Sequence, residues 1–145
     1  MWLSSERSAI ETADPRRMIV VDASVMVEAL GLREHVQDRL VDEDLHAPHL
    51  LDAEVAQALR TMLRRGTVTQ ARASAALADL AQIELDRHGH QDLLPRVWEL
   101  RDNLTAYDAL YVALAEQLGC ALVTLDRRLA GMPGQRVTVE VLAPG

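Results

Sequence analysis

Four acidic residues interrupt stretches of this sequence that otherwise favour apolar side chains: Asp22, Glu54, Asp108 and Asp126. An ionised carboxylate taken out of water is costly unless it is paired, hydrogen-bonded or bound to a cation. Acids embedded in hydrophobic patterns therefore indicate a metal site. Ligands of oxygen alone suit Mg²⁺ or Mn²⁺ better than zinc, and such an ion keeps bound waters that can attack a phosphodiester.

Two of these acids directly follow short apolar runs. Asp22 ends the run MIVVD, and Asp126 follows ALVTL. In open α/β sheets, ligands bind beyond the carboxyl ends of the strands, so both acids are expected at such an edge. Each could instead cap a following helix, although Ser24 is a competing cap candidate after the first run.

The other two acids lie on expected helices. Glu54 shares a mostly apolar helix face, but Gln57 on the same face keeps a solvated surface glutamate as an alternative. Asp108 lies on one face with Leu104, while Thr105 and Asp108 also fit the capping-box pattern. Purely structural roles would need a separate explanation for each acid, whereas one cluster of carboxylates explains them all.

The elements that must position these acids follow from hydrophobic periodicity and capping residues. Extended segments are expected at residues 18–22, 45–48, 121–126 and 137–142, and residues 85–91 form a short strand or a loop. Helices are expected at residues 24–31, 33–41, 50–65, 69–84, 92–103, 104–119 and 126–131. Strands alternating with helices predict an α/β fold, a mainly parallel central sheet flanked by helices.

Composition excludes several classes of protein. The 145 residues fit one domain, and all 15 basic residues are arginines, set against 22 acids for a net charge of −7. A phosphate-binding P-loop needs a lysine, and a protein that holds nucleic acid through a broad basic face needs the opposite charge. The single cysteine, Cys120, excludes an internal disulfide. Without an apolar run that could span a membrane or direct secretion, we expect a cytoplasmic protein.

Four segments together resemble the PIN-domain ribonuclease toxins of the VapC family. They are VDAS at Asp22, PHLLDAE ending at Glu54, LTAYDALYVALAE around Asp108 and VTLDRRLA around Asp126. The resemblance covers residues 18–142. It implies a PIN-domain-like three-layer sandwich in which the four acids bind Mg²⁺ or Mn²⁺. It also implies that the hydroxyl of Thr124 orients an acid or a water behind the ligands.

The resemblance further implies an activity and partners. A metal-activated water would cleave RNA, leaving a 5′-phosphate and a 3′-hydroxyl, and a cognate VapB antitoxin would inhibit the enzyme by placing an arginine near the acids. Members of the family commonly form homodimers. Alternatives are a PIN nuclease that processes RNA without an antitoxin and a catalytically silent PIN-like binding module.

Other acid-rich phosphate-handling folds fit the residues less well. A phosphate-accepting receiver needs a lysine, which the chain lacks, and a haloacid-dehalogenase-type phosphotransferase needs an acid at the position of Ser24. A neighbouring gene for a small DNA-binding protein would favour the toxin over the RNA-processing nuclease.

The family pattern also predicts the domain boundaries. Residues 1–17 are expected to be a flexible N-terminal extension, and residues 18–145 the PIN-like nuclease domain, because Met18 stands where family members begin. Mass spectrometry of the natural protein tests this, and a product that starts at Met1 would contradict it.

Histidines and arginines elsewhere are weaker candidates. His88 and His90 flank a glycine and His46 and His49 bracket a proline, and all four are interpreted as loop residues outside the site. Candidates for contact with phosphate or substrate lie close in sequence to the acids: Arg101, Asn103, Arg127 and Arg128.

Overall fold

The computed structural model describes residues 17–31 and 33–144, and its centre is a parallel sheet of five strands. The strands are β1 (Arg17–Val21), β2 (Glu43–Pro48), β3 (Asp86–His88), β4 (Ala121–Thr124) and β5 (Val139–Val141). Their order across the sheet is β3-β2-β1-β4-β5, and every neighbouring pair is parallel. The predicted parallel α/β sheet is confirmed.

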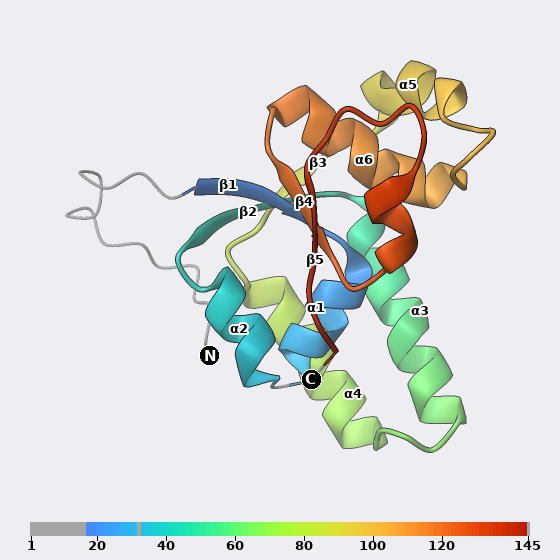
Figure 1. The fold of residues 1–145 in the computed structure, drawn as a ribbon. Helices are drawn as coiled ribbons and strands as arrows, with labels where there is room; N and C mark the ends of the chain where they lie inside the picture. The colour runs from blue at the N-terminus through green and yellow to red at the C-terminus, as the bar shows by residue number, and fades with distance from the viewer. Residues whose placement is uncertain (1–16, 32, 145) are drawn as a thin grey trace.

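Helices cover both faces of this sheet, which makes the molecule a three-layer sandwich (Figure 1). On one side lie α1 (Ala23–Leu30), α2 (Glu34–Leu40), α3 (Leu50–Arg64) and α4 (Gln70–Gln82). On the other lie α5 (Leu94–Glu99) and α6 (Ala106–Leu118), and short 3₁₀ turns occupy η2 (Gln91–Leu93) and η3 (Arg127–Gly131). The expected fold class is therefore confirmed.

The strand order reverses between β1 and β4, the strands that end just before Asp22 and Asp126. Val21 pairs with Val123 in parallel register, and the next backbone N–H, that of Asp22, donates to the Val123 carbonyl at 3.3 Å. This is the position at which doubly wound sheets open a crevice for ligands. The backbone alone thus brings the first and last acids to one edge.

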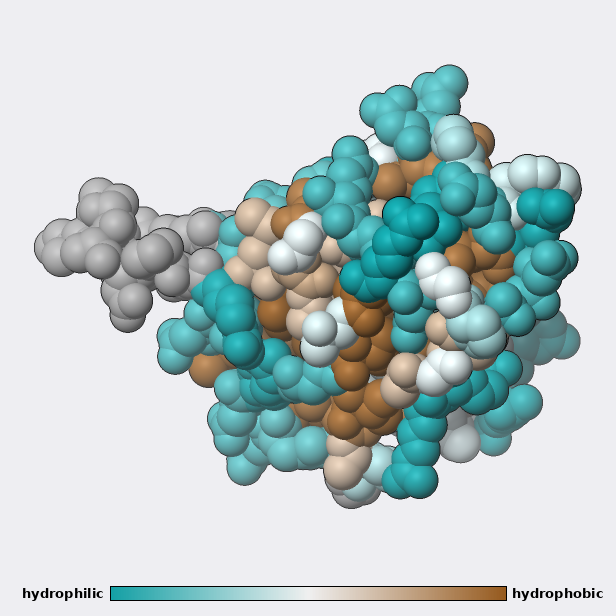
Figure 2. All heavy atoms as spheres, turned by 45° about the horizontal axis from the view of Figure 1, so that its top comes forward, coloured by the Kyte–Doolittle hydropathy of each residue, from teal (hydrophilic) through white to brown (hydrophobic). Residues whose placement is uncertain are grey.

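The core explains why these elements form. Ile19, Val20 and Val21 on the central strand β1 are fully buried. Residues 109–115 of α6 are buried without interruption, because the helix packs across β1, β2 and β4 and also against α5. This part of α6 is therefore apolar on all sides, whereas a surface helix has apolar residues along one face only. On the outer surface in Figure 2, hydrophobic side chains form a central band between hydrophilic ones. Within residues 17–31 and 33–144, the most exposed large apolar side chain is Trp98, at 68%.

Local details differ from the predictions at the first helix. Asp22 rather than Ser24 is the N-cap of α1, because the Asp22 carboxylate accepts from the Val25 N–H at 3.2 Å. Ser24 lies inside the helix and donates its hydroxyl to Asp22. The short helix expected at 126–131 is present as the 3₁₀ helix η3.

The predicted N-terminal extension falls on residues that lie largely outside the described part of the chain. Residues 1–16 are not described, whereas Arg17, which the prediction placed in the extension, is the first residue of β1 and pairs with Glu43. Among the described helices, none is long and apolar enough to cross a bilayer.

Candidate active site

Each of the four predicted acids lies near the carboxyl ends of β1 and β4, but on a different element. Asp22 caps α1, Asp126 caps η3, Glu54 lies in the second turn of α3, and Asp108 lies in the first turn of α6. Their charges influence one another. Besides burial, the charge of Asp108 raises the pKa of both Asp22 and Glu54, and the charge of Asp22 also raises that of Glu54. Burial and the charge of Asp126 raise the pKa of Asp108. The four acids therefore lie close enough for their charges to interact in pairs.

Asp22 is the most buried of the four, with 8% of its surface exposed. Its Oδ1 accepts from the Ser24 hydroxyl at 2.6 Å and from the Val25 N–H at 3.2 Å, and its Oδ2 accepts from the Thr124 hydroxyl. Three donors fix the carboxylate in one orientation. Asp22 is thus a helix cap and, at the same time, a site residue.

Thr124 connects the ends of the two strands. Its fully buried hydroxyl donates to Asp22 and accepts from the backbone N–H of Asp126 at 3.0 Å. A hydroxyl can do both because it carries one proton and two lone pairs. This geometry fits the predicted positioning role of Thr124.

Sequence reasoning missed Tyr111. The hydroxyl of this residue, 2% exposed on α6, donates to Glu54 Oε1 at 2.5 Å across the layers. The pair joins α3 to α6 and aims the Glu54 carboxylate. The available signal was the spacing of three residues between Asp108 and Tyr111, which puts both on one helix face.

Three of the acids carry raised pKa values. Burial raises the pKa of Asp22 and of Glu54, hydrogen bonds to their carboxylates oppose it, and the charge of Asp108 raises both further. Burial, followed by the charge of Asp126, raises the pKa of Asp108. A divalent cation would relieve both causes, because it replaces lost hydration and neutralises repulsion. The oxygen-only donor set suits a hard ion such as Mg²⁺ or Mn²⁺.

Asp126 behaves differently because it has a cationic neighbour. Arg128 forms a forked contact with its carboxylate, the shortest bond being 2.6 Å, and this hydrogen bonding lowers the pKa of Asp126. Within the described residues, no three of the four acids bring one oxygen each within 4.8 Å of one another.

We expect the raised pKa values to make the chelator-treated protein less stable as the pH rises. The folded state binds protons on Asp22, Glu54 and Asp108 more tightly than the unfolded state does. The resulting stability is fully present below the ordinary pKa values of 3.8 and 4.5 and is lost as the pH rises through the raised values. Urea unfolding in EDTA measures the free energy of unfolding as a function of pH. The range of about pH 4 to 8 is chosen because the pKa values of buried carboxyl groups can rise by several units.

The readout is the difference between the wild type and Asp22→Asn. His88 has a pKa lowered by burial, so it contributes in the opposite direction around its ordinary value of 6.5, equally in both proteins. The advantage of Asp22→Asn should grow with pH. A constant difference would show that Asp22 does not titrate as described.

Of the other residues considered from the sequence, only some lie close to the four acids. Arg128 contacts the site through Asp126, whereas Arg101 stacks over Trp98 at 4.9 Å and donates to the Trp98 carbonyl. Arg127 and Asn103 are exposed. His46 and His88, interpreted as loop residues, lie in strands β2 and β3. These strands cover the segment 45–48, expected to be extended, and part of the segment 85–91, for which the sequence leaves a strand or a loop open.

The sequence and fold are similar to known proteins. Residues 19–135 match the PIN domain family. The chain is 45% identical to Ribonuclease VapC9 of Mycobacterium tuberculosis over 113 residues, covering 78% of this chain and 89% of that protein. It is 46% identical to Ribonuclease VapC3 of the same organism over 120 residues, covering 80% and 88%.

A solved structure agrees. The crystal structure of PAE2754 from Pyrobaculum aerophilum superposes with a TM-score of 0.64 at 28% identity, covering 86% of this chain and 84% of that one. The match to the family spans most of the chain, including all four acids and Thr124. The chain therefore belongs to the PIN-domain family and, within it, to the VapC ribonucleases.

Proposed function

We propose that this protein is a metal-dependent endoribonuclease, the toxin of a toxin-antitoxin pair, with Asp22, Glu54, Asp108 and Asp126 as its metal ligands. The observation that supports the proposal is that Thr124 bonds both Asp22 and the Asp126 N–H where β1 and β4 end, while the charges of Glu54 and Asp108 interact with those of the other two acids. Membership of the VapC ribonucleases supports RNA as the substrate.

The cofactor we propose is Mg²⁺ or Mn²⁺, which would supply an activated water and neutralise charge on the phosphate. The chain's own residues prepare the site. Thr124 and Ser24 hold Asp22 in a fixed orientation, and Tyr111 does the same for Glu54. Ligands fixed before binding avoid the cost of ordering them later.

The acidic site also favours a basic inhibitor. At a net charge of −7 the chain would attract a basic antitoxin segment, and an arginine placed among the acids could pair with them as Arg128 pairs with Asp126. We propose a VapB-type antitoxin as this partner. A homodimer remains a prediction from the family resemblance.

The function is tested by controlled expression in bacteria, followed by sequencing of RNA ends. We expect growth arrest and new 5′-phosphate ends at defined sites, both suppressed when the protein encoded by the adjacent gene is co-expressed. Cleavage that the adjacent protein does not suppress would favour an RNA-processing PIN nuclease. Absence of new ends would favour a silent binding module.

Tyr111→Phe should reduce RNA cleavage about 10- to 100-fold, the usual effect of removing a group that orients a metal ligand. The change deletes only the hydroxyl that donates to Glu54. The Mg²⁺ concentration for half-maximal cleavage should rise as well. Tyr107→Phe, on the same helix and 60% exposed, is the matched control and should cleave normally. Equal activity of both variants would remove Tyr111 from the site.

A further inference from the structure

A second group of potential metal ligands lies on β2 and β3 and includes none of the four acids. One ligand atom from each of Asp44, His46 and Asp86 lies within 4.8 Å of the others. Asp44 and His46 are two residues apart on β2, and Asp86 pairs with His46 in the neighbouring strand. Side chains two apart on a strand point to the same face. The sheet therefore presents all three on one side.

The imidazole of His46 is the unusual member of this group. The residue is only 6% exposed, yet its Nε2 has no hydrogen-bond partner among the described residues. Asp44 Oδ2 lies 3.0 Å and Asp86 Oδ2 3.8 Å from this nitrogen, both outside hydrogen-bond geometry. A buried polar atom without a partner is costly, so a ligand is expected opposite it.

The distances suit a transition metal. Bonds of about 2.0–2.2 Å to nitrogen and oxygen at tetrahedral angles put two zinc ligands about 3.3 Å apart. The two observed separations from Nε2, 3.0 and 3.8 Å, lie on either side of that value. A nitrogen among the ligands also favours zinc over Mg²⁺.

His88 contacts the ring nitrogen of His46 that faces away from the two carboxylates. Its Nε2 lies 2.8 Å from His46 Nδ1, and the two rings are 5.1 Å apart. If His46 Nε2 keeps its lone pair for a metal, Nδ1 carries the proton and donates it to His88. Metal-binding histidines usually have such an acceptor.

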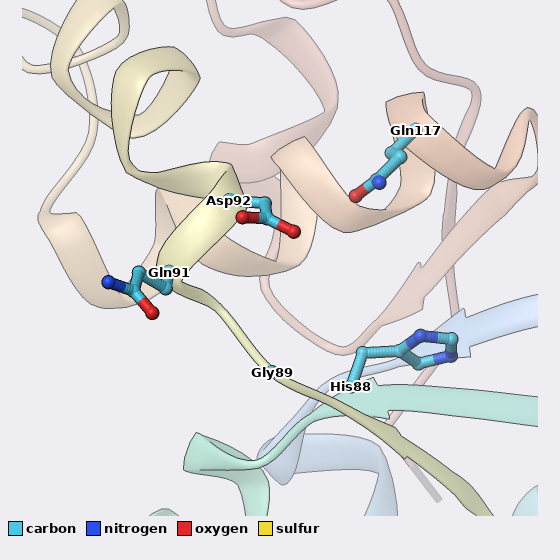
Figure 3. Close-up of a pocket in the computed structure, with 5 residues that line it drawn as sticks. All are labelled: His88, Gly89, Gln91, Asp92 and Gln117. Carbon is cyan, nitrogen blue, oxygen red and sulfur yellow. The ribbon is translucent and has the colours of Figure 1, made fainter.

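Access to the cluster is open. The side chain of Asp86 is 64% exposed, and a depression of about 370 Å³ adjoins His88. Figure 3 shows the ring of His88 pointing away from Gln91 and Asp92, which line the same depression. The exposure of Asp86 leaves the cluster open to an ion from solvent at this edge of the sheet.

We propose that Asp44, His46 and Asp86 form a zinc site that cross-links the edge strand β3 to β2, with His88 as the positioning residue behind His46. Because β3 has only three residues, a metal that joins it to β2 would stabilise this edge. The site is independent of the proposed nuclease centre.

Zinc titration of the full chain, followed by calorimetry and by NMR of the imidazole nitrogens, tests the proposal. The Asp22→Asn variant serves as the background, because it should weaken any metal binding at the proposed nuclease centre. One zinc should bind, with a shift of the His46 Nε2 resonance and a raised melting temperature. His46→Gln should abolish this binding, and His88→Phe should weaken it about 10- to 100-fold.

Further variants keep the test decisive if His46→Gln fails to fold. Asp86→Asn changes an exposed side chain and should weaken zinc binding at least about tenfold, as loss of a ligand or its partner does. His90→Gln and Cys120→Ser should bind zinc normally. Either of two results would overturn the site in favour of a simple ion pair. One is zinc binding that is unchanged by Asp86→Asn, and the other is a His46 ring that carries protons on both nitrogens in the presence of one equivalent of zinc.

Discussion

Asp22→Asn is expected to lower the rate of RNA cleavage about 10³-fold, which corresponds to about 4 kcal/mol of lost transition-state stabilisation. The substitution removes a charged ligand while keeping the size of the side chain. The remaining carbonyl can still accept from the Val25 N–H and Ser24, so α1 keeps its cap. Single-turnover cleavage of a defined RNA under saturating Mg²⁺ measures the effect.

The variant should remain folded. The pKa of Asp22 is raised chiefly by burial, so the ionised carboxylate is less stable in the chelator-treated fold than in water, and a neutral amide avoids that cost. We expect its melting temperature in EDTA to equal or exceed that of the wild type. Asp38→Asn, on the exposed face of α2, is the matched control and should cleave normally. Full activity of folded Asp22→Asn would refute the proposed mechanism.

Removal of divalent cations should abolish cleavage, with a loss of at least about 10³-fold, because the proposed chemistry depends on metal-activated water. Dialysis against EDTA followed by stepwise addition of MgCl₂ or MnCl₂ measures the loss and its recovery. Calcium, which prefers longer bonds and more ligands, should restore less activity. Cleavage that persists in EDTA would exclude the metal mechanism.

The same titration distinguishes the nuclease centre from the zinc site. Mg²⁺ should raise the melting temperature of the wild type but not of Asp22→Asn, because the proposed Mg²⁺ ligand is lost. His46→Gln should respond to Mg²⁺ as the wild type does. Identical responses of the wild type and Asp22→Asn to Mg²⁺ would place Mg²⁺ outside the proposed centre.

Local patterns were sufficient to predict the sheet and the helices. The short run at residues 18–22, rich in β-branched side chains, is typical of a strand, and β1 covers residues 17–21. Gly119 ends α6 in the left-handed conformation expected of a helix-terminating glycine. The positions of Asp22 and Asp126 followed because strand ends in a parallel sheet share an edge. The two structural alternatives for these acids, helix caps, are also confirmed, so capping and a place in the site are compatible.

Contacts between distant residues could not be predicted in this way. The bond from Tyr111 to Glu54 joins residues 57 apart, and that between His46 and His88 joins residues 42 apart. Neither sequence neighbourhood contains a signal for its partner. His46 is expected in the extended segment 45–48 but is interpreted as a loop residue without a partner role, because its surroundings depend on β3, which is distant in sequence.

The bond from Thr124 to Asp22 makes the active centre sensitive to how β1 and β4 pair. Successive side chains on a strand point to opposite faces. A shift of one strand by a single residue would therefore turn Thr124 away from Asp22, and the Thr124 hydroxyl would no longer reach the Asp22 carboxylate. A misaligned sheet would therefore be inert even if it were compact. Catalytic competence would appear late in folding, only once the two central strands had locked into their final alignment.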